Sequence, residues 1–339
     1  MSPRPFPTSY EQALRHVAER SSGGPVDPAL RVTLNFHPDR LVRGKLILDA
    51  LVEDGVYRSQ FVTGTSNGGL TAYPGGDRWR WESRIFGGAY DEAPAAERPV
   101  YGALNFRRNP VGGAPRFGSA HFRLATKTLT RTTFCYPDSF LEPSAFGVAA
   151  RMSLIELAEA DSVDALDDYI EAQAHGPLRL NRDVEAVVLD PCYRDTAVEA
   201  SARRLPCPVE WHPGFSLSVE DLRRHPDYRG QEYVDLGAEI AADGRLDPRL
   251  AGNAARAGRH DEQSLKRVWH YLARFGAPPS QSGDEAARQG PVEGGPLADG
   301  GQPMAGPVEI FADRPSAART RPPGGRKHHA SPGPHRARV

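Results

Sequence analysis

The stretch "YIEAQAHGPLRLNRDVEAVVLD", residues 169–190, decides our interpretation of the fold. Its first residues alternate in the period-two pattern of a strand with two different faces. The sequence His175-Gly176-Pro177 then signals a turn. Residues 184–189 are rich in valine, which suits a second strand. We therefore expect a strand, a turn and a return strand in this part of the chain.

Three polar side chains share one face of the first of these strands. Glu171, Gln173 and His175 are spaced two residues apart, so their side chains point the same way. An acid, an amide and an imidazole are poor core material unless they are paired. They suit a pocket in which the acid binds a hydroxyl or activates a nucleophile. The alternative is an ordinary exposed strand face.

The rest of the chain predicts an α+β fold with a mixed, largely antiparallel sheet flanked by helices. Further strands are expected at residues 30–36, 57–62, 99–106, 116–124, 131–136 and 208–217. Helices are expected at residues 9–20, with Ser9 as the N-cap, and at 39–55, 75–90, 150–160, 218–242 and 261–275.

The pattern divides the chain into three parts. Residues 1–29 are expected to form an N-terminal helix and a linker, and residues 30–276 a single α+β domain. Residues 277–339 are rich in Pro and Gly, lack sustained apolar periodicity and end in a basic segment. We expect this last part to be a disordered tail.

Composition and charge exclude several classes of protein. The net charge of −1 hides a basic end, because seven cations and no acid follow Asp313, which leaves −8 on residues 1–313. The body is therefore not a nucleic-acid-binding domain by charge, although the tail could make weak contacts. Three cysteines are too few for a disulfide framework and are expected to be free thiols. No apolar run is long enough for a membrane span or a secretory signal, so we expect a cytoplasmic protein.

The segment "YRSQFVTGTSNGGL", residues 57–70, predicts a site for an anion. Arg58 lies in an expected strand that leads into a loop almost free of side chains. A guanidinium beside exposed backbone amides can hold a phosphate or carboxylate. The segment matches neither the Rossmann fingerprint nor the P-loop. An ordinary surface arginine is the alternative. The residues we expect at this site are Arg58, Ser59, Gly64, Ser66, Gly68 and Gly69.

Metal binding is a weaker possibility. The candidate ligands do not show the local two-ligand spacing of a metal helix or loop, so no metal is expected. These candidates are His37, His121, His212, Asp39, Asp77, Glu82 and Asp190. A metal-dependent hydrolase or nuclease that uses His37, Asp77, His121 and Glu171 is the runner-up function. A third possibility is a non-catalytic nucleotide-binding or interaction module.

Many blocks of the sequence, in order, resemble a bacterial family known as domain-of-unknown-function family 3626. They include "LNFHPDR", "ERPVYGALN", "PRFGSAHFRL", "TTFCYPDS", "HGPLRLNRDVEAVVLDPCYRDT" and "EWHPGF". The resemblance covers roughly residues 30–240. It implies membership of a family, but it implies no activity.

A second resemblance implies an activity. Tyr-Arg on a strand, a Gly/Ser loop, a hydroxyl-bearing strand and then a Glu-bearing strand is similar to the plan of the ADP-ribosyltransferase superfamily. In that superfamily an Arg or His on the first core strand grips NAD, a Ser/Thr strand or a Tyr shapes the nicotinamide pocket, and a late Glu activates the transfer. The resemblance implies Arg58, or its rival His37, for the first role and Glu171, with Gln173 beside it, for the last.

Ser139, in "TTFCYPDS", is the candidate for the hydroxyl, and Ser119 is an alternative. The resemblance further implies NAD as the substrate that is cleaved, and an acceptor that can be a protein. Two departures are visible. The usual Ser-Thr-Ser triplet is absent, and Gln173 follows Glu171, whereas many members place a Gln or Glu two residues before the catalytic acid.

Overall fold

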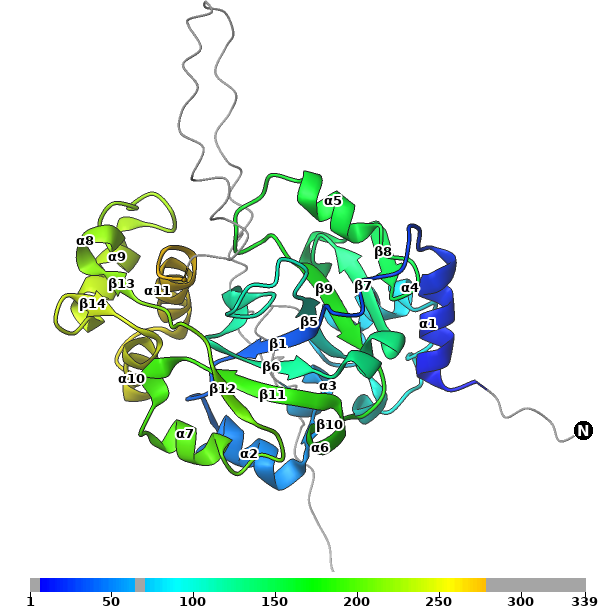
Figure 1. Cartoon of the computed structure of the whole chain (residues 1–339), viewed down its shortest axis with the longest axis horizontal. Coiled ribbons are helices and arrows are strands. Elements are labelled where there is room, and N and C mark those ends of the chain that lie inside the picture. Colours follow the sequence, from blue (N-terminus) through cyan, green and yellow to red (C-terminus); the bar gives the residue numbers. More distant parts are fainter. Residues whose placement is uncertain (1–6, 65–70, 279–339) are drawn as a thin grey trace, which may run out of the picture. The chain divides into compact units, whose positions relative to one another are not determined.

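The computed structural model describes residues 7–64 and 71–278, and its centre is an eight-stranded sheet. The strands lie in the order β12-β11-β6-β1-β5-β9-β7-β8 (Figure 1). Neighbouring strands are antiparallel except for the parallel pair β11 and β12. The expected α+β class with a mixed, largely antiparallel sheet is confirmed. The strands are β1 (Val32–Phe36), β5 (Val100–Leu104), β6 (Ala120–Leu124), β7 (Thr132–Tyr136), β8 (Ala145–Val148), β9 (Ile170–Ala174), β11 (Val184–Leu189) and β12 (Val209–Trp211).

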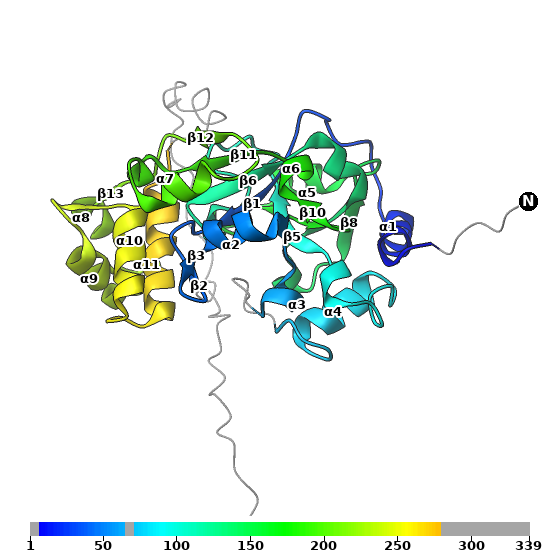
Figure 2. The same cartoon turned by 90° about the horizontal axis from the view of Figure 1, so that it is seen from below.

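Helices gather at both ends of this sheet. Figures 1 and 2 show α8, α9, α10 and α11 at one end and α1 and α4 at the other. The helices are α1 (Ser9–Glu19), α2 (Ile47–Asp54), α3 (Gln60–Thr63), α4 (Asp77–Ile85), α5 (Leu154–Ala160), α6 (Leu180–Asp183), α7 (Ala197–Ala202), α8 (Val219–Leu222), α9 (Gln231–Ile240), α10 (Pro248–Ala257) and α11 (Glu262–Phe275). None of the described helices is long and apolar enough to cross a membrane.

Short strands and 3-10 turns complete the described elements. The short strands are β2 (Leu41–Val42), β3 (Lys45–Leu46), β4 (Val56–Tyr57), β10 (Leu178–Arg179), β13 (Leu217–Ser218) and β14 (Arg245–Leu246). The 3-10 turns are η1 (Ala95–Glu97), η2 (Pro115–Phe117), η3 (Thr126–Arg131), η4 (Ser139–Leu141) and η5 (Pro191–Tyr193).

The two faces of the sheet differ in chemistry. Residues opposite each other in an antiparallel pair point to the same face, so the register assigns every side chain. One face carries apolar side chains such as Leu34, Phe122 and Ile170, and these belong to the largest buried cluster described. We call the other the polar face. It carries Thr33, Asn35, Tyr101, His121, Thr133, Cys135, Glu171 and Gln173.

The strand expected at residues 184–189 exists as β11, but it does not pair with β9. β9 and β11 are separated in the sheet by β5, β1 and β6. Between them residues 178–183 form β10 and α6, and β10 pairs with β4 outside the main sheet. This excursion carries the chain away from β9, so the turn at Gly176 does not close a hairpin.

The strand expected at residues 57–62 is wrong. Only Val56 and Tyr57 are extended, and Gln60–Thr63 form a helical turn that ends at Gly64. Gly64 adopts a left-handed conformation with φ 66°, as a helix C-cap requires. Alternation of apolar and polar residues over so few positions does not distinguish a strand from a helical turn. Arg58 therefore lies between two short elements and not on the sheet.

The prediction of a helix at residues 39–55 is confirmed only for its second half. Its first part is the hairpin of β2 and β3, and only α2 is helical. Arg43 and Gly44 both have positive φ, 52° and 77°, which suits a two-residue hairpin turn. The helix expected at 218–242 is divided into α8 and α9, and the strand at 208–217 into β12 and β13.

The sequence-based expectation did not include β8, α7, α10 or the short strand β14, nor most of the 3-10 turns. At the N-terminus, α1 is capped by Thr8 with Glu11 in a capping box, so the N-cap lies one residue before Ser9. The expected tail, residues 277–339, lies outside the described residues except for residues 277 and 278.

Truncating a side chain of the apolar face should lower the free energy of unfolding. Leu34 lies on the central strand β1 and is 0% exposed, whereas Leu41 on β2 is 47% exposed. We expect Leu34→Ala to lower the free energy of unfolding by about 3 kcal/mol, because it removes buried methyl groups and leaves a cavity. The control Leu41→Ala should change it by less than about 0.5 kcal/mol. Urea unfolding measures both, and equal losses would contradict this assignment of the core.

Candidate functional site

Glu171 is the centre of a hydrogen-bonded cluster on the polar face. Its Oε2 accepts hydrogen bonds from the hydroxyl and the amide of Ser139, at 2.8 and 3.2 Å. Its Oε1 accepts one from Nε2 of Gln173 at 3.0 Å. Its side chain keeps 9% exposure. The structure thus brings together the three residues that the sequence analysis predicts as catalytic.

A guanidinium joins this cluster, and it is not that of Arg58. Nη1 of Arg78, on α4, donates to the Ser139 hydroxyl at 2.5 Å and lies 3.8 Å from Oε1 of Glu171. The guanidinium carbon lies 4.1 Å from the centre of the Tyr101 ring, a cation–π contact. Arg78 is buried, so its charge is held by these partners and not by water.

A second buried carboxylate lies one helical turn beyond Arg78. Glu82 accepts from Nη1 of Arg98 at 2.6 Å and from the Tyr101 hydroxyl at 2.7 Å. Burial raises the pKa of Glu82 to about 7, although Tyr101 and Arg98 both lower it. Glu82 therefore fixes the position of the Tyr101 ring on the polar face.

Sequence analysis missed Arg78 as a site residue and considered Glu82 only as a metal ligand. Their spacing of four residues on the helix expected at 75–90 puts them on one side of it. Trp81 and Ile85 lie on the same buried side of α4. Two charged residues among the inward-facing positions of a helix are a signal of a buried ion pair, and this signal was available in the sequence.

A chain of hydrogen bonds fixes the orientation of Gln173. The Thr133 hydroxyl donates to Oε1 of Gln173 at 2.8 Å, so it can only accept from Nε2 of His175, 2.9 Å away. Nδ1 of His175 then accepts from the Tyr90 hydroxyl at 2.7 Å. Each group has one role, and the chain leaves the amide nitrogen of Gln173 directed at Glu171.

The ionisation of the cluster follows from its burial. Burial and, to a smaller extent, the charge of Arg131 lower the pKa of His175 to about 3, so the imidazole is neutral at pH 7. Burial also raises the pKa of Glu171, while Arg78 and the hydrogen bonds from Ser139 lower it. A carboxylate held by fixed donors in a poorly hydrated place can stabilise positive charge on a neighbouring group.

The residues predicted to bind the cofactor are not gathered around Glu171 by any described contact. Arg58 is 46% exposed and makes a two-point ion pair with Asp54, at 2.7 and 2.8 Å. The Ser59 hydroxyl donates to the carbonyl of Ala95 at 2.7 Å. Gly64 ends α3. The other three predicted residues, Ser66, Gly68 and Gly69, lie outside the described residues.

His37, the rival of Arg58, lies just beyond the end of the main-sheet strand β1. Its ring makes an edge contact with Trp269, with centroids 4.8 Å apart. Burial lowers the pKa of His37 to about 4, so it can donate or accept a hydrogen bond but carries no charge at pH 7. The alternative hydroxyl, Ser119, is buried at the entry to β6, and its Oγ finds no partner among the described residues.

The residues of the metal-dependent alternative do not assemble. No three His, Cys, Asp or Glu side chains within residues 7–64 and 71–278 lie close enough together to hold a metal ion. His37, Asp77, His121 and Glu171 are therefore not a ligand set in the described structure. The three cysteines, Cys135, Cys192 and Cys207, are free thiols, as expected.

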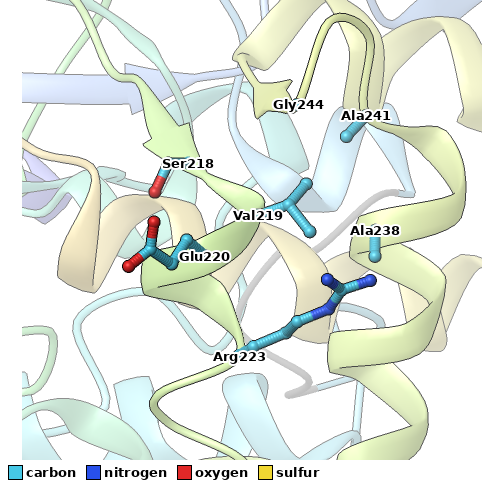
Figure 3. Close-up of a pocket in the computed structure, with 7 residues that line it drawn as sticks. All are labelled: Ser218, Val219, Glu220, Arg223, Ala238, Ala241 and Gly244. Carbon is cyan, nitrogen blue, oxygen red and sulfur yellow. The ribbon is translucent and has the colours of Figure 1, made fainter.

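A surface hollow of about 720 Å³ lies away from this cluster, between α8 and α9. Figure 3 shows the side chain of Arg223 extending across it toward Ala238. Its other polar groups serve the helix: the Ser218 hydroxyl accepts from the amide of Asp221 at 3.0 Å, and Glu220 pairs with Arg224 at 2.6 Å. It contains no set of converging reactive groups, so we place the candidate site at Glu171.

The neutral His175 predicts acid sensitivity. In the unfolded chain a histidine takes up a proton near pH 6.5, but in the folded protein His175 does so only near pH 3. The free energy of unfolding therefore falls as the pH drops from 6.5 toward 3, by about 1.4 kcal/mol per pH unit for this one residue. We expect His175→Gln to reduce the slope between pH 5.5 and 4 by about that amount, as urea unfolding at several pH values would measure. A slope unchanged by the substitution would mean that His175 protonates equally in both states.

Comparison with known proteins adds a family. The chain matches the family described as "Protein of unknown function (DUF3626)" over residues 31–159 and 146–275. No curated protein matches the chain. The family resemblance expected over residues 30–240 is confirmed and extends to residue 275. Because the matched residues make up most of the chain and include every strand of the main sheet, the protein belongs to this family of unknown function.

Proposed function

We propose that the protein is an NAD-dependent ADP-ribosyltransferase in which Glu171 is the catalytic carboxylate. The observation that carries this proposal is the state of Glu171 on the polar face. Ser139, Gln173 and Arg78 hold its two oxygens from three directions, and 9% of the side chain remains exposed. Burying a carboxylate costs free energy, which these fixed donors offset. The carboxylate they hold in place can stabilise a positive charge that develops beside it.

The chemistry requires such a group. When the bond between nicotinamide and ribose breaks, its electron pair leaves with nicotinamide and positive charge builds on the sugar. An ionised Glu171 stabilises that charge and accepts a hydrogen bond from a ribose hydroxyl. A nucleophile of the acceptor then supplies an electron pair to the same carbon and loses its proton. The acceptor can be a side chain of another protein.

The positions of Tyr101 and Ser139 support the same proposal. Tyr101 is opposite Gln173 in the register, on the strand next to Glu171. Its ring is fixed by Glu82 on one side and Arg78 on the other. A rigid ring and a hydroxyl beside the carboxylate suit the binding of a flat heterocycle such as nicotinamide. Arg78 is occupied by its partners and acts as a positioning residue.

Arg58 and His37 remain the two candidates for gripping the dinucleotide. Arg58 carries a full charge and is exposed, so it suits the diphosphate. On binding, its guanidinium would leave Asp54 and pair with the diphosphate instead. His37 is neutral at pH 7, because burial lowers its pKa to about 4, and it suits a ribose hydroxyl. The proposal assigns the diphosphate to Arg58 and a hydroxyl to His37.

Glu171→Gln tests the catalytic role. The substitution keeps an acceptor for the Ser139 hydroxyl but removes the charge, so we expect kcat for nicotinamide release to fall about 10²- to 10³-fold. The matched control is Glu210→Gln, on β12 of the same sheet and exposed, with unchanged turnover. Nicotinamide release and label transfer from NAD, with circular dichroism as a check of folding, give the answer. NAD bound but never cleaved by the wild type would favour a non-catalytic binding module. Turnover unaffected by Glu171→Gln would remove Glu171 from the mechanism.

Arg58→Gln tests the cation. If Arg58 binds the diphosphate equally in the ground and transition states, KM for NAD rises about tenfold and kcat stays the same. Initial rates over a range of NAD concentrations separate the two constants. An unchanged KM would contradict the role of Arg58, and the same measurement on His37→Asn would then show whether His37 carries the binding.

A further inference from the structure

Ser139 meets Glu171 from η4, the short turn that follows β7. The hydroxyl and the amide of Ser139 both donate to Oε2 of Glu171. We propose that Asp138 and Tyr169 are positioning residues, which hold η4 where Ser139 reaches the carboxylate and place a second negative charge beside it. The inference goes beyond the proposed function, because it concerns Glu171 itself and not the substrate that the site takes.

Asp138 is the N-cap of η4. Its Oδ1 accepts hydrogen bonds from the amides of Phe140 and Leu141, at 3.1 and 3.3 Å. The amide of Leu141 also donates to the Asp138 carbonyl at 3.1 Å. A carboxylate in this position satisfies amides at the start of a helical turn and fixes the backbone of its first residues. Ser139 lies in the chain between the cap and those amides, so its backbone is fixed as well.

Tyr169 attaches the same carboxylate to the strand that carries Glu171. Its hydroxyl donates to Oδ2 of Asp138. Tyr169 directly precedes β9 and lies two residues before Glu171. It is buried, and its ring makes an edge contact with the ring of Phe117, with centroids 5.6 Å apart. A ring packed in this way has little freedom to move, so its hydroxyl gives η4 a fixed attachment to the sheet.

The two attachments of η4 lead to the same segment of the chain. Glu171 binds Ser139. The preceding residue, Asp138, binds Tyr169, two residues from Glu171. A donor that is fixed in advance stabilises a charge without reorganising at the moment of reaction. Without the hydroxyl of Tyr169, the bonds from Ser139 would have to hold η4 in place as well as bind the carboxylate.

Asp138 also acts on Glu171 through its charge. Burial raises the pKa of Glu171, and the charge of Arg78 lowers it. Asp138 raises the same pKa, whereas the hydrogen bonds from Ser139 lower it. Burial raises the pKa of three further groups near this carboxylate, which are therefore uncharged at pH 7: Tyr101, Cys135 and Tyr169. Fixing η4 thus favours the ionised carboxylate, and the charge of Asp138 disfavours it.

Carbon-13 NMR titration of Glu171 in the full chain tests the inference, with its carboxyl resonance assigned by its loss in Glu171→Gln. Ser139→Ala removes a donor to the carboxylate and should raise its pKa by about one unit. Tyr169→Phe keeps the buried ring but frees η4, so we expect a rise of about half a unit. The matched control is Tyr228→Phe, which removes a hydrogen bond to Asp164, at 3.1 Å, and should leave the pKa unchanged.

Asp138→Asn tests the charge. The variant keeps one side-chain oxygen for the amides of η4 but is neutral, so the pKa of Glu171 should fall by about one unit. Asp164→Asn, the matched control, should leave it unchanged. Shifts of opposite sign in Tyr169→Phe and Asp138→Asn are not expected of two residues that only stabilise the fold.

Two results would overturn the inference. An unchanged pKa of Glu171 in Tyr169→Phe, with the circular dichroism spectrum of the wild type, would mean that η4 is held without Tyr169. An unchanged or raised pKa in Asp138→Asn would mean that the charge of Asp138 does not act on Glu171. Both results are read from the carboxylate and not from turnover. A chain that never cleaves NAD would therefore contradict the proposed function and leave this test intact.

Discussion

The cost of burying the Glu171 carboxylate is the constraint on which the rest of the site depends. A charge on a sheet interior loses its water, and only partners supplied by the protein can offset that loss. Here they come from separate elements: Ser139 from η4, Gln173 from β9 itself and Arg78 from α4. The position of α4 over the polar face is therefore as much an electrostatic requirement as a matter of apolar packing.

The partners of Glu171 are buried too, so each of them needs partners of its own. Once Arg78 is buried, its guanidinium needs the Tyr101 ring, and Tyr101 in turn donates its hydroxyl to Glu82. Glu82 then requires Arg98. On the other side, the orientation of Gln173 depends on Thr133 and on a neutral His175. Each buried polar group needs partners of its own, which explains why several polar side chains, and not a single one, gather on this face.

Local periodicity predicted the parts of this arrangement that lie within one element. The spacing of Glu171, Gln173 and His175 was enough to place them on one face of a strand, and the valines of residues 184–189 were enough for β11. It did not reveal that three strands lie between β9 and β11, because the order of strands in a sheet depends on tertiary packing. The partner arginine was misplaced for a related reason. Arg58 was chosen for its neighbours in sequence, whereas Arg78 meets Glu171 only through the packing of a helix on a sheet.

The distribution of satisfied and unsatisfied groups separates structural cations from ligand-binding ones. Arg78 and Arg98 are buried and bind Ser139, Glu171 and Glu82, so neither can hold an incoming anion without breaking the network that positions Glu171. Arg58, in contrast, is exposed and its ion pair with Asp54 lies at the surface. A buried cation paired within the fold stabilises the fold, whereas an exposed cation can exchange its partner for an anion. By that criterion Arg78 belongs to the structure that positions Glu171, and Arg58 is the arginine of the two that an anion can reach.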